Sequence, residues 1–198
     1  MKNLSTDSYN LYAEYLNKRI LDSQHLTEDS IRYSFFIAAL QTTDIQQHEI
    51  ILELPHPRFL GKEVDTYILP AELRPATYIE FKFHRASKST SAKPQKAGSL
   101  FKDFSRSCSI KTDNSLCLIV YVTDAEMAKY FDKNSSAYSG FWDYGVESSF
   151  IYDENFTSKT TDTFRRVSGD LHISKVNVAY SRQLVSGYHL RVFEVDVT

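Results

Sequence analysis

The 198-residue sequence is poor in cysteine and has no long apolar run. Its two cysteines, Cys108 and Cys117, do not make a disulfide framework or a CxxC metal site, and we expect two reduced thiols in the core. No apolar stretch approaches the roughly 18 residues that a membrane-spanning helix needs. The N-terminal stretch MKNLSTDSYNLYAEYLNKRI is too polar for a signal peptide. These absences predict a cytoplasmic protein with no membrane partner.

Several functional motifs are also missing. The Gly-Lys pair in LGKEVD lacks the upstream glycine and the following Ser or Thr of a phosphate-binding P-loop. There is no GxGxxG, GxSxG or HExxH motif, and the six histidines have no metal-ligand spacing. Both cysteines fall in apolar patterns, so we do not expect a cysteine nucleophile. A small-molecule hydrolase of another class therefore has no motif to support it.

The net charge of −2 conceals an uneven distribution. Residues 82–111 carry eight Lys or Arg residues and a single acid, Asp103, which gives +7, and the remaining residues carry −9. A basic segment in an otherwise acidic chain is typical of a face that binds a polyanion. A solvated, lysine-rich loop and helix would have the same composition, so both interpretations stay open.

Hydrophobic periodicity predicts a single domain of the α/β (α+β) class, with a central mixed β-sheet flanked by helices. Helices are expected at residues 8–20, 27–40, 96–109 and 125–133, and strands at 48–54, 63–69, 77–85, 115–124, 171–180 and 188–197. We expect residues 86–95 to form a surface loop, the strand at 115–124 to be buried on both faces, and the last two strands to pair. The predicted core spans residues 27–131, and residues 134–198 form an aromatic-rich extension. Its aromatic side chains serve either base stacking or target choice, or else they are an ordinary packed cluster.

The predicted strand at 77–85 has one apolar face and one charged face. Glu80 and Lys82 lie two residues apart, so their side chains emerge on the same face. Asp65 lies on the preceding strand, and an antiparallel turn would bring it beside them. Mg²⁺ prefers carboxylate, water and phosphate oxygens, and phosphodiester hydrolysis also needs a nearby cation. The charged face is therefore either the floor of a metal site or a solvated surface with an ordinary ion pair.

This order of residues, Asp65 followed by IEFKFHR with Glu80 and Lys82, resembles the PD-(D/E)XK nuclease superfamily, which has the restriction-endonuclease-like fold. The resemblance covers residues 27–131 as helix, three strands, helix, strand, helix. It implies that Asp65 and Glu80 ligate Mg²⁺ or Mn²⁺ and that Lys82 orients the attacking water, which makes these three the catalytic set. The backbone carbonyl of Phe81 and the side chain of Glu28 are implied as further metal ligands. An acid in the first turn of a helix is equally explained by the helix dipole, so both interpretations of Glu28 stay open.

Two positions depart from the superfamily pattern or add to it. The proline that names the motif is replaced by Val64, and many members lack that proline. Glu63 shares a strand face with Asp65 and is an alternative or additional ligand.

The resemblance and the basic segment together imply a nucleic-acid partner, with DNA as the first expectation. Gln95 or Lys96 would reach the scissile phosphate, and Lys102 and Arg106 would contact the backbone. The full set of expected nucleic-acid-binding residues is Arg85, Lys88, Lys93, Gln95, Lys96, Lys102 and Arg106.

The leading hypothesis is thus a metal-dependent nuclease. The alternative is a catalytically inactive nucleic-acid-binding or protein-interaction module of the same fold, which needs no metal. A homodimer is expected only by analogy with enzymes that cut both strands.

Overall fold

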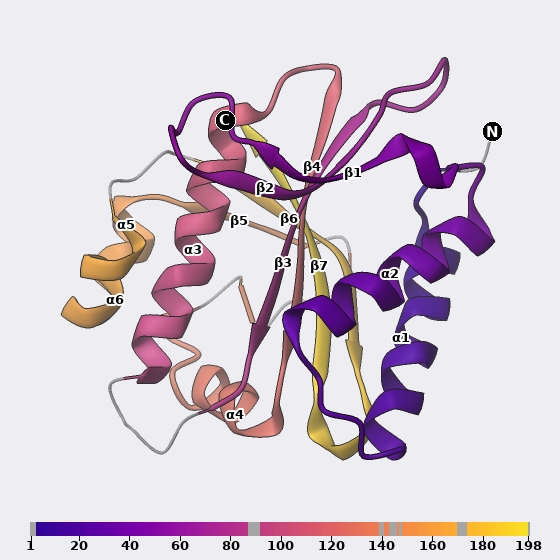
Figure 1. Cartoon of the computed structure of the whole chain (residues 1–198). Helices are drawn as coiled ribbons and strands as arrows, with labels where there is room; N and C mark the ends of the chain where they lie inside the picture. The colour runs from indigo at the N-terminus through magenta and orange to yellow at the C-terminus, as the bar shows by residue number, and fades with distance from the viewer. Residues whose placement is uncertain are drawn as a thin grey trace.

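The computed structural model describes residues 3–86, 92–138, 141–142, 146, 148–169 and 174–197. Within these residues, seven strands form one mixed sheet in the order β1-β2-β3-β4-β7-β6-β5 (Figure 1). The strands are β1 Ile50–Pro55, β2 Glu63–Ile68, β3 Ala76–His84, β4 Ser115–Thr123, β5 Ser149–Tyr152, β6 Ser174–Gln183 and β7 His189–Val197. The helices are α1 Thr6–Leu21, α2 Glu28–Thr42, α3 Ala92–Ile110, α4 Ala125–Lys133, α5 Glu154–Ser158 and α6 Asp162–Ser168, with 3₁₀ turns η1 Gln47–Glu49 and η2 Val185–Gly187.

The helices lie on both sides of the sheet, as the sequence predicted. Figure 1 shows α1 and α2 on one side and α3, α5 and α6 on the other. Ile79 and Phe81 of β3 pack with the residues of α1 and α2, whereas Tyr121 of β4 packs with those of α3. The predicted burial of β4 on both faces is confirmed, since every residue but Leu116 is buried. No helix among the described residues is long and apolar enough to cross a membrane.

The helix that follows β3 begins earlier than predicted. Residues 92–95 belong to the first turn of α3 and not to a loop. Pro94 is accepted there because the first N–H groups of a helix have no intrahelical partner. Later in α3, Gly98 allows α6 to pack closely, since a Cβ at this position would lie 2.7 Å from the carbonyl oxygen of Phe164.

The C-terminal part of the chain completes the same sheet. β6 and β7 pair antiparallel, as predicted, and β7 also pairs with β4. The short elements β5, α5 and α6 have no counterpart in the sequence prediction. Aromatic side chains from this region, among them Phe141 and Phe150, are buried against Phe101 and Phe104 of α3. These aromatic side chains are therefore core residues and not a stacking surface for bases.

Candidate active site

β2 and β3 separate at Thr66. Their antiparallel pairing runs from Ile68–Thr77 to Thr66–Ile79, after which the beginning of β2 pairs only with β1. β3 stays parallel to β4 as far as His84. Opposite Asp65, β1 is distorted at Glu53, whose φ of 54° is unusual for a residue with a side chain. Among the described residues, the second half of β3 therefore has no partner strand on one edge.

Two carboxylates occupy this open edge in place of a strand. Oδ2 of Asp65 accepts a hydrogen bond from the amide of Phe81 at 2.7 Å, and Oε2 of Glu28 accepts one from the amide of Phe83 at 3.1 Å. Because the N–H and C=O groups of one strand residue point to the same edge, the Phe81 carbonyl also faces this opening. The structure thus brings Asp65, Phe81 and Glu28 to one edge of β3, from three different elements.

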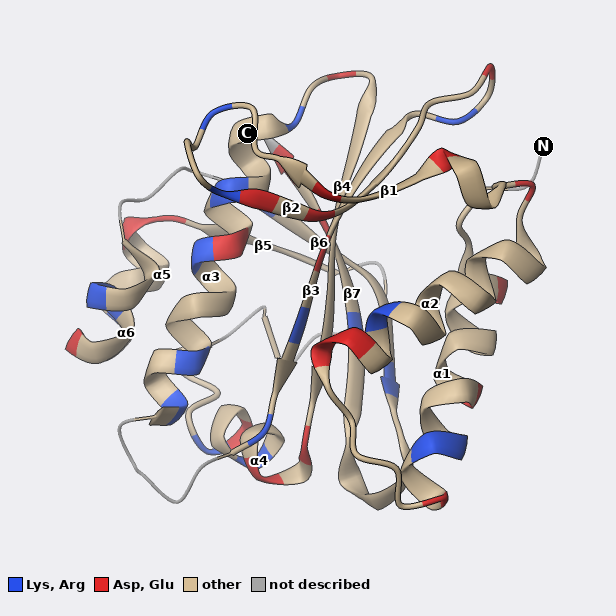
Figure 2. Ribbon diagram, viewed as in Figure 1, with Lys and Arg blue, Asp and Glu red and all other residues tan. Residues whose placement is uncertain are grey.

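Glu28 reaches β3 because of where α2 begins. The hydroxyl of Thr27 caps the helix by accepting a hydrogen bond from the amide of Ser30 at 3.1 Å. This cap places Glu28 in the first turn, and Figure 2 shows that acidic turn beside β3. Glu28 therefore bonds directly to the open edge of β3, in addition to any interaction with the helix dipole.

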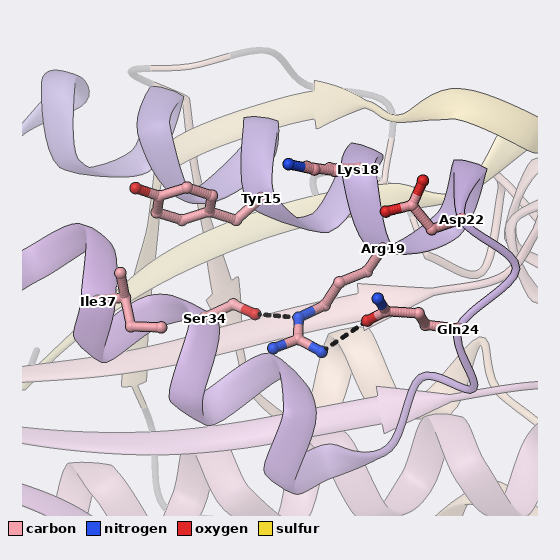
Figure 3. A pocket seen from close by; sticks show the side chains of 7 residues that line it. All are labelled: Tyr15, Lys18, Arg19, Asp22, Gln24, Ser34 and Ile37. Atoms are coloured by element: carbon pink, nitrogen blue, oxygen red, sulfur yellow. Dashed lines mark hydrogen bonds between the residues drawn. The ribbon is translucent and has the colours of Figure 1, made fainter.

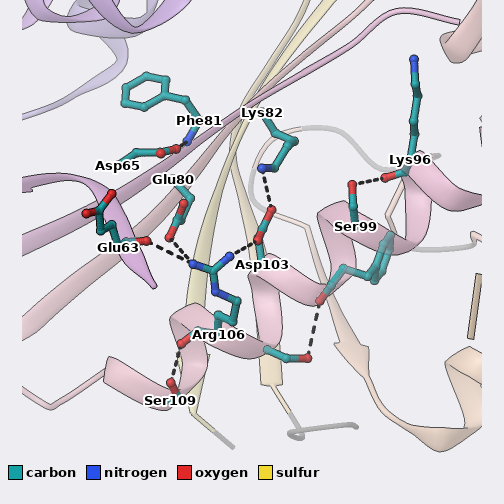
Figure 4. A network of polar contacts seen from close by, with 12 residues as sticks. Glu63, Asp65, Glu80, Phe81, Lys82, Lys96, Ser99, Asp103, Arg106 and Ser109 are labelled. Carbon is teal, nitrogen blue, oxygen red and sulfur yellow. Dashed lines mark hydrogen bonds and ion pairs between the residues drawn. The ribbon is translucent and has the colours of Figure 1, made fainter. Parts of the chain in front are cut away.

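The charged face of β3 lies beneath α3 and not in solvent. Glu80 is 5% exposed, and Nζ of Lys82 lies 3.1 Å from Oδ2 of Asp103, an α3 residue that is 3% exposed (Figure 4). The interpretation of this face as a solvated surface is therefore wrong. The reason is that α3 packs over β3, which the spacing of residues within the strand does not reveal.

Arg106 joins α3 to both strands. Its Nη1 lies 3.0 Å from Oδ1 of Asp103, and its Nη2 lies 3.7 Å from Oε1 of Glu80 and donates to the carbonyl of Glu63 at 3.1 Å. Figure 4 shows this guanidinium between the two strands and α3. Glu63 thus contributes its backbone to the site, and its side chain is exposed.

We call Glu28, Asp65, Glu80 and Asp103 the carboxylate cluster. Three cations balance it: Lys82 and Arg106, and Arg32 of α2, whose Nη2 lies 3.3 Å from Oδ1 of Asp65. Four acids and three bases converge here within the space between α2, β3 and α3. Such a concentration of ionisable groups on one partly open strand is typical of a functional site.

The cluster perturbs the protonation of its members. Burial, and then the charges of Asp65 and Asp103, raise the pKa of Glu80 to about 9, so this carboxyl is protonated near neutral pH. Burial also raises the pKa of Glu28. For Lys82, burial lowers the pKa, but the carboxylates of Asp103 and Glu28 outweigh burial, and the net shift is upward. Lys82 is therefore a permanent cation and a hydrogen-bond donor at neutral pH.

The donor atoms suit a hard divalent cation. No group of three or more His, Cys, Asp and Glu side chains in the described ranges is arranged to hold a metal ion. Mg²⁺ is commonly held by only one or two carboxylates together with water and substrate phosphate. Asp65, Glu80 and the Phe81 carbonyl supply oxygen donors of that kind and number. The carboxyl of Glu80 makes no hydrogen bond to any described residue, and it faces the guanidinium of Arg106 at 3.7 Å.

The predicted nucleic-acid-binding residues divide into two groups. Near the end of β3 and the first turns of α3, the ammonium of Lys96 donates to the carbonyl of Arg85, Lys93 lies 4.0 Å from Glu126, and Gln95 is exposed. Figure 4 shows Lys96 pointing away from the Asp103–Arg106 pair. None of these contacts brings this first group to the carboxylate cluster.

The second group lies further along α3. Lys102 is exposed one residue before Asp103, and Arg106 pairs with Asp103 and Glu80 of the cluster. Lys88 lies outside the described residues. The structure therefore places Arg106 against the cluster and Lys102 beside Arg106 in the lining of one pocket, whereas Arg85 lies elsewhere, beside the end of α1 and η2.

A hollow between α1 and α2 offers a contrast. It has a volume of about 250 Å³, and its Arg19 donates hydrogen bonds to Ser34 at 2.8 Å and to Gln24 at 3.0 Å (Figure 3). It shares no lining residue with the carboxylate cluster. Because Arg19 is already hydrogen-bonded within the hollow, this hollow is a weaker candidate for a binding site than the carboxylate cluster.

Sequence reasoning missed two site residues, Asp103 and Arg32, and one contact, that of Arg106 with Glu80. Asp103 was noted only as the single acid of the basic segment, although its place beside the inward-facing Phe104 and three residues after Leu100 would have indicated burial. Arg32 and the contact of Arg106 with Glu80 had no signal in the sequence. Both depend on how α2 and α3 pack against the sheet.

Comparisons of the chain with protein-family models, with curated proteins and with solved structures give no match.

Proposed function

We propose that this protein is a metal-dependent nuclease that hydrolyses phosphodiester bonds, with DNA as its substrate. The observation that carries the proposal is the 2.7 Å hydrogen bond from the Phe81 amide to Asp65. This bond joins the acid of β2 to the Glu80–Lys82 segment of β3 where the two strands separate. An acid on one strand and an acid–x–lysine on its antiparallel neighbour is the arrangement that the resemblance to PD-(D/E)XK nucleases leads one to expect.

Each residue has a role that follows from its environment. Asp65, Glu80 and the Phe81 carbonyl would hold Mg²⁺ or Mn²⁺, with Glu28 close enough to the same strand edge to assist. When bound, such a metal acts as a Lewis acid and lowers the pKa of a water ligand. Glu80, which is protonated near neutral pH, would lose its proton when a divalent cation replaces its present surroundings.

Lys82 acts as a donor in this proposal. Its ion pair with Asp103 fixes the ammonium on the charged face of β3 and keeps it charged. A charged ammonium cannot take a proton from water, but it can orient the attacking water and offset the negative charge that develops on the phosphate. Asp103 is a positioning residue, since it acts through Lys82.

The test is cleavage of plasmid DNA, single-stranded DNA and RNA with Mg²⁺ or Mn²⁺ and with an EDTA control. Lys82→Ala is expected to lower the rate by about 100-fold or more, as the loss of one preorganised donor does in other enzymes. Tyr78→Phe is the matched control, because Tyr78 lies on the same strand face in the half of β3 that pairs with β2. Circular dichroism would establish that both variants fold.

Two results of the cleavage experiment would overturn the nuclease proposal. If the wild-type protein cuts none of the three substrates with either metal, or if Lys82→Ala and Tyr78→Phe cut equally well, the cluster has no catalytic role.

One observation favours a second function, a nucleic-acid-binding module without activity. Arg32, Lys82 and Arg106 already neutralise most of the carboxylate cluster, as a site that never takes up a metal would require. Isothermal calorimetry with Mn²⁺ separates the two functions. The nuclease requires metal binding that Asp65→Asn weakens, and the binding module requires that no such heat is seen.

A further inference from the structure

A pocket with a volume of about 510 Å³ lies beside the carboxylate cluster, between the β1–β2 loop, α3 and the end of α6. Arg58 and Lys62 of the loop and Lys102 and Arg106 of α3 line it, together with Phe59 and Leu60. None of the described residues that line it is acidic. Its volume lies in the range of roughly 300–1,000 Å³ that small-molecule sites occupy.

The loop that carries Arg58 and Lys62 is held in shape by His56. The amide of His56 donates to the carbonyl of Lys62 at 2.7 Å, and its ring Nδ1 accepts hydrogen bonds from the amides of Arg58 and Phe59 at 3.1 and 3.2 Å. His56 itself is buried. The loop therefore presents its two cations and its two apolar side chains from a fixed backbone.

Three of the four cations have no ion-pair partner among the described residues. Arg58, Lys62 and Lys102 form no ion pair with any described residue, whereas Lys93 and Lys129 elsewhere are both paired with Glu126. Like charges that converge without acids repel each other, and an anion that enters between them relieves that repulsion. The pocket is thus electrostatically prepared for a phosphate group.

The apolar side chains narrow the choice of anion. Leu60 is fully exposed and Phe59 is partly exposed, and both line the same pocket as the cations. An inorganic phosphate ion would contact only the cations and would leave Phe59 and Leu60 without a role in binding. A nucleotide has a phosphate for the cations and a flat base for an aromatic or aliphatic wall.

We propose that this pocket binds one nucleotide unit of a nucleic-acid strand, with its phosphate among Arg58, Lys62 and Lys102 and its base against Phe59 and Leu60. Arg106 links the pocket to the cluster, because its guanidinium lies 3.7 Å from Glu80. The bound nucleotide is therefore a neighbour of the scissile phosphate, and this assignment of position rests on the proposed nuclease function.

The test is binding of a short, fluorescein-labelled single-stranded oligodeoxynucleotide, measured by fluorescence anisotropy in EDTA at several salt concentrations. Lys102→Gln should weaken binding about fivefold and reduce the salt slope by about one. Leu60→Ala should weaken binding about threefold or more and leave the salt slope unchanged, because it removes only apolar contact. Leu60 is fully exposed, so its loss does not threaten folding, and Lys129→Gln on α4 is the matched charge control.

Competitors identify the ligand. A free nucleoside monophosphate should displace the oligonucleotide weakly and inorganic phosphate more weakly still, since a strand adds contacts beyond one nucleotide. Displacement by polyglutamate as effective as by unlabelled oligonucleotide would overturn the assignment, as would a Leu60→Ala variant that binds like wild type. Wild-type or control-like binding by Lys102→Gln, or no binding by the wild type, would also overturn it.

The same measurements separate this inference from the nuclease proposal. Binding is recorded in EDTA, where no metal-dependent cleavage occurs. If Lys102→Gln and Leu60→Ala lose binding while the wild type cuts nothing, the assignment of the pocket as a nucleotide-binding site is supported and the nuclease proposal fails. If the wild type cuts DNA while both variants bind normally, the nuclease proposal stands and the pocket assignment fails.

Discussion

The two halves of β3 are built differently. From Thr77 to Ile79 the strand has backbone partners on both sides, β2 and β4. From Glu80 to His84 only β4 remains, and carboxylates of Asp65 and Glu28 bond to the other edge. A backbone ladder forms with almost any side chain, whereas the second half requires acids at two distant positions in the sequence. The half that carries the proposed chemistry is therefore the half whose structure depends most on particular residues.

The largest stability effect is expected from Asp65→Ala. This change leaves the Phe81 amide and the guanidinium of Arg32 without their carboxylate in a partly buried site. Loss of a charge-assisted hydrogen bond and of an ion-pair partner should lower the free energy of unfolding by about 3 kcal/mol. Urea denaturation monitored by circular dichroism measures the change.

Thr66→Val is the matched control for Asp65→Ala. Thr66 is the adjacent residue, lies in the paired part of β2, and has a buried hydroxyl without a hydrogen bond. Its replacement should leave the free energy of unfolding unchanged or raise it by up to about 1 kcal/mol. A loss from Thr66→Val as large as that from Asp65→Ala would show that the two parts of β2 do not differ.

The next largest effect is a gain in the free energy of unfolding of the Glu80→Gln variant relative to wild type, and this gain depends on pH. The pKa of Glu80 is raised to about 9 in the folded protein, so the folded state holds this proton more tightly than the unfolded chain. As pH rises from about 4.5 to about 9, the wild-type protein loses stability through Glu80. Glu80→Gln does not titrate, and its free energy of unfolding should rise relative to wild type by about 2 kcal/mol between about pH 5 and pH 7.

Chemical denaturation at a series of pH values in EDTA measures this difference. A constant difference between Glu80→Gln and wild type across that range would mean that Glu80 is ionised in the folded protein. The same variant should lose activity in the presence of metal, because an amide is a poor substitute for a carboxylate ligand.

The smallest effect is expected from Glu28→Ala. Glu28 bonds to the Phe83 amide at 3.1 Å, but it lies near the end of the open edge and in the first turn of α2, where the cap at Thr27 remains. We expect a loss of about 1 kcal/mol in the free energy of unfolding. Hydrogen exchange at the Phe83 amide should accelerate while exchange at the Ile79 amide stays slow. Equal acceleration at both amides would contradict the difference between the halves of β3.

The sequence predicted the parts of this site that depend on local periodicity. The alternation of apolar and charged residues along 77–85 predicted the two faces of β3. The turn between the strands predicted that Asp65 would lie on an antiparallel neighbour of the strand that carries Glu80. The Thr27 cap and the spacing of Ile31 and Phe35 gave α2. These features follow from neighbouring residues, so a single sequence contains them.

The parts that depend on packing between distant segments were not predictable. β2 separates from β3 near a backbone distortion at Glu53, whose φ is positive. Nothing in the sequence around Glu53 indicates this distortion. The burial of Glu80 and its approach to Arg106 depend on how α3 lies across the sheet. The short elements β5, α5 and α6 owe their form to aromatic contacts with Phe101 and not to a period of their own.

The position of β7 has a consequence for how the protein folds during synthesis. β7 is made after the other six described strands, yet it lies between β4 and β6 near the middle of the sheet. Until it arrives, the apolar β4 has an unpaired edge of the kind that recruits other chains. The described seven-stranded sheet therefore cannot form in full until residues 189–197 have been translated. A nascent chain that stalls before that point would expose β4 to aggregation or to a chaperone.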